Sequence, residues 1–204
     1  MFETTFGVIE AALVRTYGVP DKAQGAFRGK LGNLQKQGLF GAKNMPGRGR
    51  ALRYGPDQIH RLVFACELSE LGCAPSVVVG LVDSLWERRI RSIFAKAEDV
   101  AERDPGPNDV VMLMGGVRLM TGNWTSAVPN VTAHLLRELP PKLSQWMMMG
   151  TGDPMPPRVL AVNLSSRLRQ FHAALAESHT REAASTPVQR DEANRRRARR
   201  TKVE

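Results

Sequence analysis

Apolar positions in the first half of the chain recur with the spacing of amphipathic helices. Between residues 2 and 17 they repeat every three or four positions, and a Gly-Val-Pro turn at 18–20 ends the run. The same spacing predicts further helices over 21–37, 57–71 and 75–102. The first hundred residues are therefore expected to form four helices.

The second of these helices and the segment after it allow more detail. Gly38 suits the C-terminal end of the helix over 21–37, whereas three internal glycines also allow a short helix, a turn and a second helix from Phe27. Segment 39–54 has a proline and two glycines at its centre, between short runs of other residues. This composition predicts a β-hairpin with a glycine-rich tip.

The second half of the chain follows a break at Asp104-Pro105-Gly106-Pro107. Beyond it the pattern predicts a strand over 110–114, a helix over 131–139, a strand over 159–164 and a helix over 165–176. From residue 177 the chain becomes polar and charged, and such a segment cannot bury enough apolar surface to fold. We expect a disordered tail there.

Composition is that of an ordinary globular protein and excludes several other classes. Of the 204 residues, 42% are hydrophobic and 24% are charged. No apolar run approaches the ~20 residues of a membrane-spanning helix, so no membrane association is expected. Cys66 and Cys73 would lie two turns apart on one helix, too far for a disulfide, and are expected to be buried thiols of a cytoplasmic protein.

Motifs of common enzyme classes do not occur in the sequence. We find no P-loop, no GxSxG elbow, no HExxH zinc motif and no dinucleotide-binding glycine pattern. The four histidines fall on separate expected elements, without the spacing of metal ligands. We therefore expect no enzyme, no cofactor and no metal.

Positive charge is concentrated in the first half of the chain. The whole chain has a formal net charge of +9, and residues 22–61 hold nine Lys or Arg against one acid, Asp57. A soluble surface normally intersperses both signs, so this local excess indicates an acidic partner. A second cluster of arginines lies at 195–200, where nonspecific binding to phosphates is expected.

Element order and charge together predict a winged helix-turn-helix. In that fold a helix enters the major groove of DNA and a hairpin wing contacts the backbone. On the basic helix, the polar side chains fall away from the Phe27, Leu31 and Leu34 stripe; asparagine suits adenine, and arginine suits guanine or phosphate. The candidate DNA-binding residues are Lys22, Gln24, Arg28, Lys30, Asn33 and Lys36 around the helix, and Lys43, Arg48, Arg50, Arg53 and Tyr54 in the hairpin.

The same region resembles the MerR family of transcription regulators. The resemblance covers roughly residues 6–85 and rests on Gly38-Leu39, Arg53-Tyr54, Asp57, Leu62 and Leu71-Gly72-Cys73. It implies that Arg53 and Tyr54 contact phosphates from the wing, and that the helix before Gly38 reads the major groove. It also implies a homodimer joined by the helix after the fourth, which residues 86–100 would supply.

The fold class expected from these observations is mainly α with a small β-hairpin wing. Residues 1–85 would form the winged helix-turn-helix, 86–103 a linker and dimerisation helix, 108–176 a small α/β or helical domain of unknown role, and 177–204 the disordered basic tail. The expected function is a dimeric, sequence-specific regulator of transcription that binds double-stranded DNA, with no effector identified. The alternative is an architectural or packaging DNA-binding protein of a phage or mobile element, such as an excisionase-like protein or a packaging adaptor.

Overall fold

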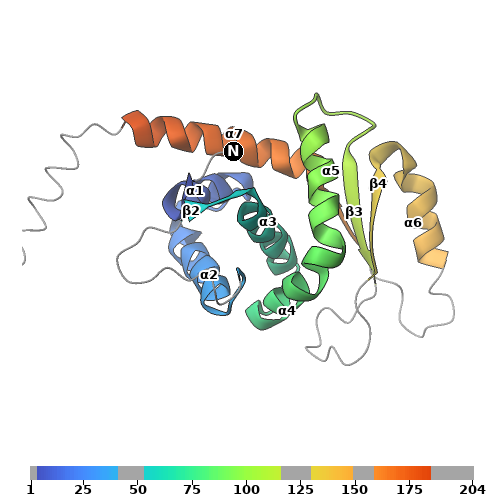
Figure 1. Cartoon of the computed structure of the whole chain (residues 1–204), viewed down its shortest axis with the longest axis horizontal. Coiled ribbons are helices and arrows are strands. Elements are labelled where there is room, and N and C mark those ends of the chain that lie inside the picture. The colour runs from blue at the N-terminus through green and yellow to red at the C-terminus, as the bar shows by residue number, and fades with distance from the viewer. Residues whose placement is uncertain (1–3, 41–52, 116–129, 149–158, 185–204) are drawn as a thin grey trace, which may run out of the picture.

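A computed structural model describes residues 4–40, 53–115, 130–148 and 159–184 (Figure 1). Over these residues the chain is mainly helical with two small antiparallel sheets, as expected for the fold class. The elements are β1 (Thr4–Thr5), α1 (Phe6–Thr16), a 3₁₀ turn (Asp21–Ala23), α2 (Gln24–Lys36), β2 (Arg53–Tyr54), α3 (Pro56–Glu70), α4 (Pro75–Leu85), a π turn (Trp86–Ile90), α5 (Arg91–Ala101), β3 (Val110–Gly115), β4 (Asn130–Leu135), a 3₁₀ turn (Leu136–Glu138), α6 (Leu139–Met148), β5 (Val159–Asn163) and α7 (Leu164–Ala184).

Glycines end the first three helices, which confirms the C-terminal helix boundaries expected from the sequence. The first helix begins at Phe6 and not at residue 2, because Thr4–Thr5 pair with β2 as a strand. Gly38 has a φ of 96°, and across it the Leu39 N–H donates to the Leu34 carbonyl at 3.2 Å. Gly18 and Gly72 also have positive φ, at 60° and 80°. Side chains other than glycine rarely adopt this conformation, so these positions stop the helices where the apolar periodicity ends.

The first small sheet ties the start of the chain to the end of the expected wing. Thr4 pairs with Tyr54 and Thr5 pairs with Arg53, in antiparallel orientation. The remainder of the expected hairpin, residues 41–52, lies outside the described residues. The strand at the end of the hairpin is therefore present, whereas the wing itself stays a prediction.

The fourth expected helix is continuous but contains a π turn at Trp86–Ile90. The buried Trp86 indole donates to Asp57 at 3.0 Å, and the guanidinium of Arg61 lies 5.0 Å from the centre of its ring. An inserted residue in a helical turn changes the direction of the helix axis. Accordingly, α4 and α5 point in different directions (Figure 1).

The apolar face of α5 is buried inside its own chain. Ile93, Phe94 and Ala97 are all buried, and α5 packs against α3, α7 and β3. The Phe94 ring lies 6.3 Å from that of Phe64 on α3. The helix that we expected to join two protomers thus uses its apolar stripe within one protomer.

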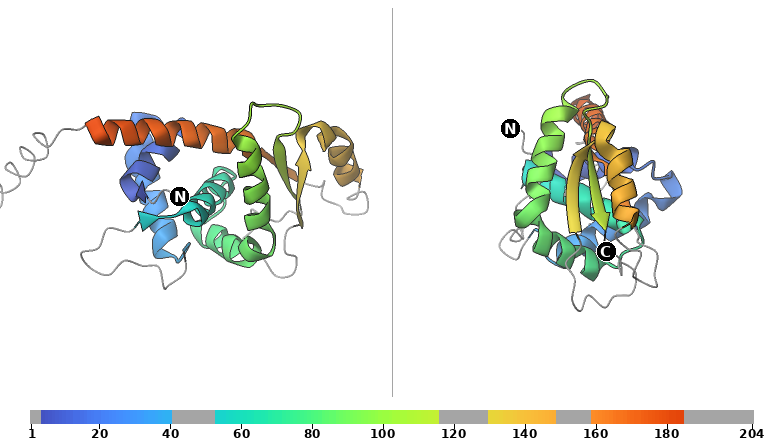
Figure 2. Two further views of the ribbon diagram at one scale, coloured as in Figure 1. Left: turned by 45° about the horizontal axis from the view of Figure 1, so that its top comes forward. Right: turned by 90° about the vertical axis from the view of Figure 1, so that its right-hand side faces the viewer.

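The second sheet is antiparallel with the strand order β4-β3-β5. Alternate residues of β3 face opposite sides, and those on both sides are buried. Met112 and Met114 belong to the main core, on the side where α5 lies, while α6 lies on the other side of the sheet (Figures 1 and 2). The strands expected over 110–114 and 159–164 are confirmed as β3 and β5.

The prediction of a helix over 131–139 is wrong. Residues 130–135 form β4, in which Val131 pairs with Met114 of β3. Val131, Ala133 and Leu135 alternate with polar residues, which is the period of a strand. The prolines at 140–141 lie in the first turn of α6, where their missing N–H groups leave no helical hydrogen bond unmade.

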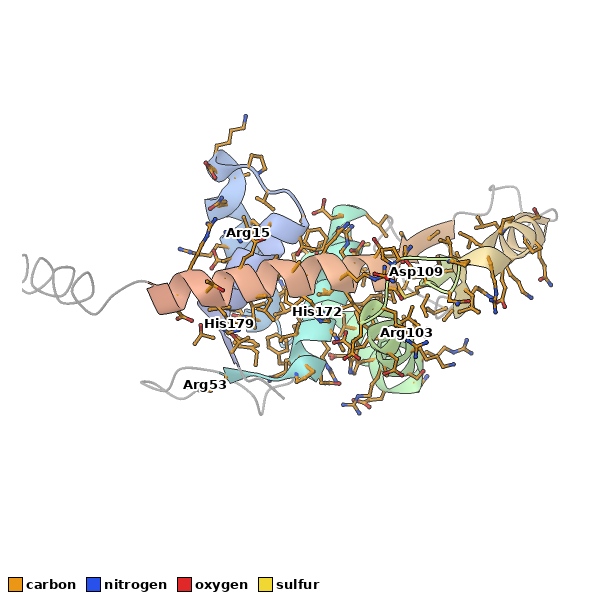
Figure 3. The ribbon with its side chains drawn as sticks, turned by 90° about the horizontal axis from the view of Figure 1, so that it is seen from above. Arg15, Arg53, Arg103, Asp109, His172 and His179 are labelled. Atoms are coloured by element: carbon orange, nitrogen blue, oxygen red, sulfur yellow. The ribbon has the colours of Figure 1, made fainter. Side chains whose placement is uncertain are left out.

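Helix α7 extends further than the sequence indicated. It continues to Ala184, so residues 177–184, which we assigned to the disordered tail, are helical. The physical reason is tertiary packing: Ala174 and Ser178 are buried, and Arg15 of α1 forms an ion pair with Glu177. Figure 3 shows α7, which carries His172, lying across α1, with Arg15 of α1 beside it. The remaining tail, 185–204, lies outside the described residues.

One core joins the two halves of the chain. Buried residues from α1 to α7, on both sides of the break at 104–107, form a single apolar cluster. Asp109, directly after the break, accepts hydrogen bonds from Arg169 (3.0 Å) and Asn163 (3.2 Å), so the break is tied to the start of α7. The expected boundary therefore separates elements along the chain but does not separate two cores.

Candidate nucleic-acid interface

Helix α2 presents a polar, glycine-lined outer face. Phe27, Leu31 and Leu34 hold it to the core and are all buried. The exposed positions on the opposite side include Gly25, Gly29, Asn33 and Lys36. A Cβ added at Gly25, Gly29 or Gly32 would meet nothing within 4 Å, so this side of the helix is open. Because glycine has no side chain, this face of the helix is narrow. The helix contains no Asp or Glu, so the face carries no negative charge.

Arg28 lies at one side of this face and is bound to α1. Its Nε atom donates to both carboxylate oxygens of Glu10, at 2.7 and 2.8 Å. The Glu10 side chain is only 8% exposed, whereas that of Arg28 is 71% exposed. A buried carboxylate therefore holds the inner edge of the guanidinium, and most of the side chain still faces solvent.

Lys30 of α2 is directed toward α3. Its ammonium group lies 3.6 Å from a carboxylate oxygen of Glu70, at the end of α3. The side chain is 34% exposed, about half of the exposed fraction of Arg28. Lys30 therefore joins two helices of the fold and lies apart from the outer face.

The other candidates around α2 are exposed or nearly so. Lys22, in the 3₁₀ turn before α2, and Lys36, in the last turn, are both exposed. The side-chain oxygen of Asn33 accepts from the side-chain amide of Gln37 at 3.2 Å, and the side-chain amide of Gln24 donates to Asp21 at 2.8 Å. The structure thus leaves Lys22, Arg28, Asn33 and Lys36 exposed and Gln24 partly exposed.

The two candidates on β2 have opposite environments. Arg53 is exposed, as expected for a residue that contacts phosphate. Tyr54 is 2% exposed, its ring lies against Phe6 and Phe40, and its hydroxyl accepts from Gln35 at 2.8 Å. Burial raises the pKa of the Tyr54 hydroxyl. The structure therefore places Tyr54 in the core, away from any surface that phosphate could reach.

The remaining wing candidates, Lys43, Arg48 and Arg50, lie outside the described residues. Their expected contacts with the DNA backbone stay predictions. The chain enters the segment that holds them from the buried Phe40 and leaves it at Arg53, on β2. The segment is therefore anchored at both ends next to the core that supports α2.

Sequence reasoning missed a buried acidic residue that holds α7 to α3 and to the end of α1. Glu67 of α3 is 7% exposed and accepts hydrogen bonds from Tyr17 at 2.9 Å and from Arg167 of α7 at 2.7 Å. Arg167 also lies over the Tyr17 ring, 4.7 Å from its centre. The sequence contains a pattern that could have predicted the burial of Glu67. This residue follows the apolar Val63 by four positions and so falls on the inward face of its helix.

A second interhelical cluster is centred on Glu98 of α5. Its two carboxylate oxygens lie 3.3 Å from His60 of α3 and 3.1 Å from His172 of α7. Burial opposes ionisation of Glu98, but the hydrogen bonds with the two histidines outweigh it and lower the pKa to about 2. The cluster connects three helices and lies away from the outer face of α2.

Among the residues that the structure describes, no group of three His, Cys, Asp or Glu side chains is arranged to hold a metal ion. Within the same ranges, none of the helices combines the length and apolar character needed to cross a membrane.

Comparison of the chain with protein-family models, with curated proteins and with solved structures found no match.

Proposed function

We propose that the chain binds double-stranded DNA, with α2 in the major groove, and that it regulates transcription. The observation that carries the proposal is the outer face of α2, which is exposed, narrow, polar and free of carboxylates. An α-helix fits the major groove, and negative side chains would be repelled by the phosphates on either side of it. The resemblance to MerR regulators over residues 6–85 supports the same helix.

Within this proposal some residues around α2 contact base edges and others contact phosphates. Asn33 is suited to the adenine edge, and Arg28 to a guanine edge or a phosphate. Because Glu10 holds the Nε atom of Arg28, the guanidinium is oriented before DNA arrives, so that less side-chain entropy is lost on binding. Lys22, Lys36 and Arg53 neutralise phosphates and set the position of the helix along the duplex.

A matched pair of lysine variants tests this interface. Lys36 on α2 and Lys96 on α5 are both exposed helical lysines. DNA selected from a random pool by the full chain serves as the ligand, and affinity is measured by fluorescence anisotropy at several salt concentrations. Lys36→Ala is expected to weaken binding and to reduce the magnitude of the log–log salt slope by about one, the loss of one phosphate contact. Lys96→Ala should leave both unchanged. Equal effects of the two substitutions would place the DNA elsewhere on the molecule.

A further inference from the structure

Tyr54 is buried between the start of α1 and the end of α2. Its ring centre lies 6.0 Å from that of Phe6, the first residue of α1, and 5.4 Å from that of Phe40, which follows α2. The contact with Phe40 is edge-to-face, at an interplanar angle of 71°, an arrangement that aromatic pairs prefer. Backbone pairing with Thr4 adds a third contact. The position of Tyr54 is therefore set by elements other than its own strand.

The hydroxyl of Tyr54 joins β2 to α2. It accepts a hydrogen bond from the side-chain amide of Gln35 at 2.8 Å. Gln35 is partly buried, the exposed Lys36 follows it directly, and the exposed Asn33 precedes it by two positions. The bond therefore ends on the part of α2 that carries residues proposed to contact DNA.

Arg53 is oriented by the burial of its neighbour. Consecutive side chains of a strand point to opposite faces, so the buried Tyr54 turns Arg53 outward, and Arg53 is exposed. The backbone of Arg53 pairs with Thr5, directly before α1. Because neighbouring Cα atoms are about 3.8 Å apart, the contacts that fix Tyr54 relative to α2 also fix the point from which the Arg53 side chain extends.

We propose that Tyr54 is a positioning residue of the DNA-binding surface, whose hydrogen bond with Gln35 sets the place of Arg53 relative to Lys36. Phosphates are fixed along a duplex, so two cations that already match them lose less entropy on binding. The inference rests on the proposed function. It gives Tyr54 an indirect role in place of the direct phosphate contact that the MerR resemblance implies.

Tyr54→Phe tests the role of the hydroxyl, because it keeps the ring and its contacts with Phe6 and Phe40. Affinity of the full chain for the selected duplex is measured by fluorescence anisotropy at several salt concentrations. We expect binding to weaken by a factor of about 2–10, which corresponds to one hydrogen bond. Tyr17→Phe is the matched control, since it removes the hydroxyl of the other tyrosine of the chain, which donates to Glu67 of α3 at 2.9 Å. This control should leave the affinity unchanged.

A double-mutant cycle separates the positioning of Arg53 from a general effect on the fold. If Tyr54 acts through Arg53, Tyr54→Phe should weaken binding by the wild-type chain but have almost no further effect in a chain that carries Arg53→Ala. The magnitude of the log–log salt slope should fall by about one in Arg53→Ala, and Tyr54→Phe should not reduce it further in that background. A merely structural role would weaken binding by the same factor in both backgrounds.

Gln35→Met breaks the same hydrogen bond from α2, with a side chain of similar length that also favours a helix. It should reproduce the loss of affinity caused by Tyr54→Phe, again only in chains that keep Arg53. Thermal melting shows whether each variant folds. If Tyr54→Phe does not fold, Gln35→Met provides the decisive measurement.

Three results would overturn the inference and leave the proposed function intact. The first is unchanged affinity in a folded Tyr54→Phe or Gln35→Met variant. The second is an equal loss of affinity in Tyr17→Phe. The third is that Tyr54→Phe weakens binding by the same factor with and without Arg53. If instead the full chain binds no duplex at low salt, the proposed function fails, and this inference fails with it.

Discussion

Arg28 has two roles in this account, because it neutralises a buried carboxylate and faces the proposed DNA. Arg28→Ala should lower the free energy of unfolding by about 1–3 kcal/mol, since Glu10 then stays buried without its partner. It should also weaken binding to the selected site by about 1–3 kcal/mol. Urea unfolding and DNA titration measure the two effects separately.

The double variant Glu10→Gln with Arg28→Ala separates the roles. Replacing the buried charge with an amide should recover most of the lost stability, whereas the loss of DNA affinity should persist. If the double variant binds DNA as tightly as the wild type, Arg28 acts only by supporting the fold.

Glu98 gives a residue-scale prediction about pH. Its pKa in the folded chain is about 2, lowered from an ordinary value of 4.5 by His172 and His60. A carboxyl group with a depressed pKa stabilises the folded state above its unfolded pKa, and this stability is lost as pH falls toward 2. We expect Glu98→Gln to cost about 1–2 kcal/mol at pH 7, reduced from the full effect because a third of the side chain is exposed.

The measurement is urea unfolding of both proteins between pH 7 and pH 3. The difference between them should shrink as pH falls below about 5, because Glu98 is then increasingly protonated in the unfolded chain. A difference that is the same at pH 3 and pH 7 would show that the glutamine acts through packing, independently of charge.

At the element scale, the glycines of α2 distinguish a DNA-reading helix from an ordinary solvated one. Gly29 on α2 and Gly80 on α4 are both exposed glycines inside helices, with open space around the position of a Cβ. Replacing either with glutamine should raise the free energy of unfolding by about 0.5–1 kcal/mol, because glycine is a poor helix former.

The two variants should differ in DNA binding. Gly29→Gln inserts a side chain between α2 and the groove and is expected to weaken binding at least about tenfold, or about 1.4 kcal/mol. Gly80→Gln should bind as the wild type does. Unchanged affinity for Gly29→Gln, with the expected gain in stability, would contradict the placement of α2 in the groove.

Elements with strong local signals could be predicted from the sequence. Helix ends at Gly18, Gly38 and Gly72 are set by backbone conformation that only glycine adopts easily, so local reasoning found them. The strand β4 was misread because apolar residues at 131 and 135 fit a helical period as well as an alternating one, and pairing with β3 decides between them. The last turns of α7 were missed because α1, far away in sequence, stabilises them.

The candidate site shows the same division between local and tertiary information. The outward direction of Arg28, Asn33 and Lys36 follows from helix periodicity around the Phe27, Leu31 and Leu34 stripe, and the structure agrees. Tyr54 could not be placed in this way. Its burial depends on strand pairing with Thr4 and on ring contacts with two residues distant in the sequence.

At the scale of the whole molecule, the two halves form one structural unit. Helix α7 starts at the sheet, packs against α5 and ends on α1, so the second half supports the helices that position α2. Asn163 caps α7, because its side-chain oxygen accepts from the Ser166 N–H at 2.9 Å. Residues 108–176, which we expected to form a separate domain, therefore help to hold in place the helices that carry the proposed DNA-binding face.

The salt dependence of binding to duplex DNA tests the central claim most directly. The observed association constant is measured by titration of the selected duplex between about 50 and 300 mM salt. If six to eight cations from α2, the expected wing and the tail contact phosphates, the log–log slope should be about −5 to −7. A slope shallower than about −2, or no binding to any duplex at low salt, would contradict the account.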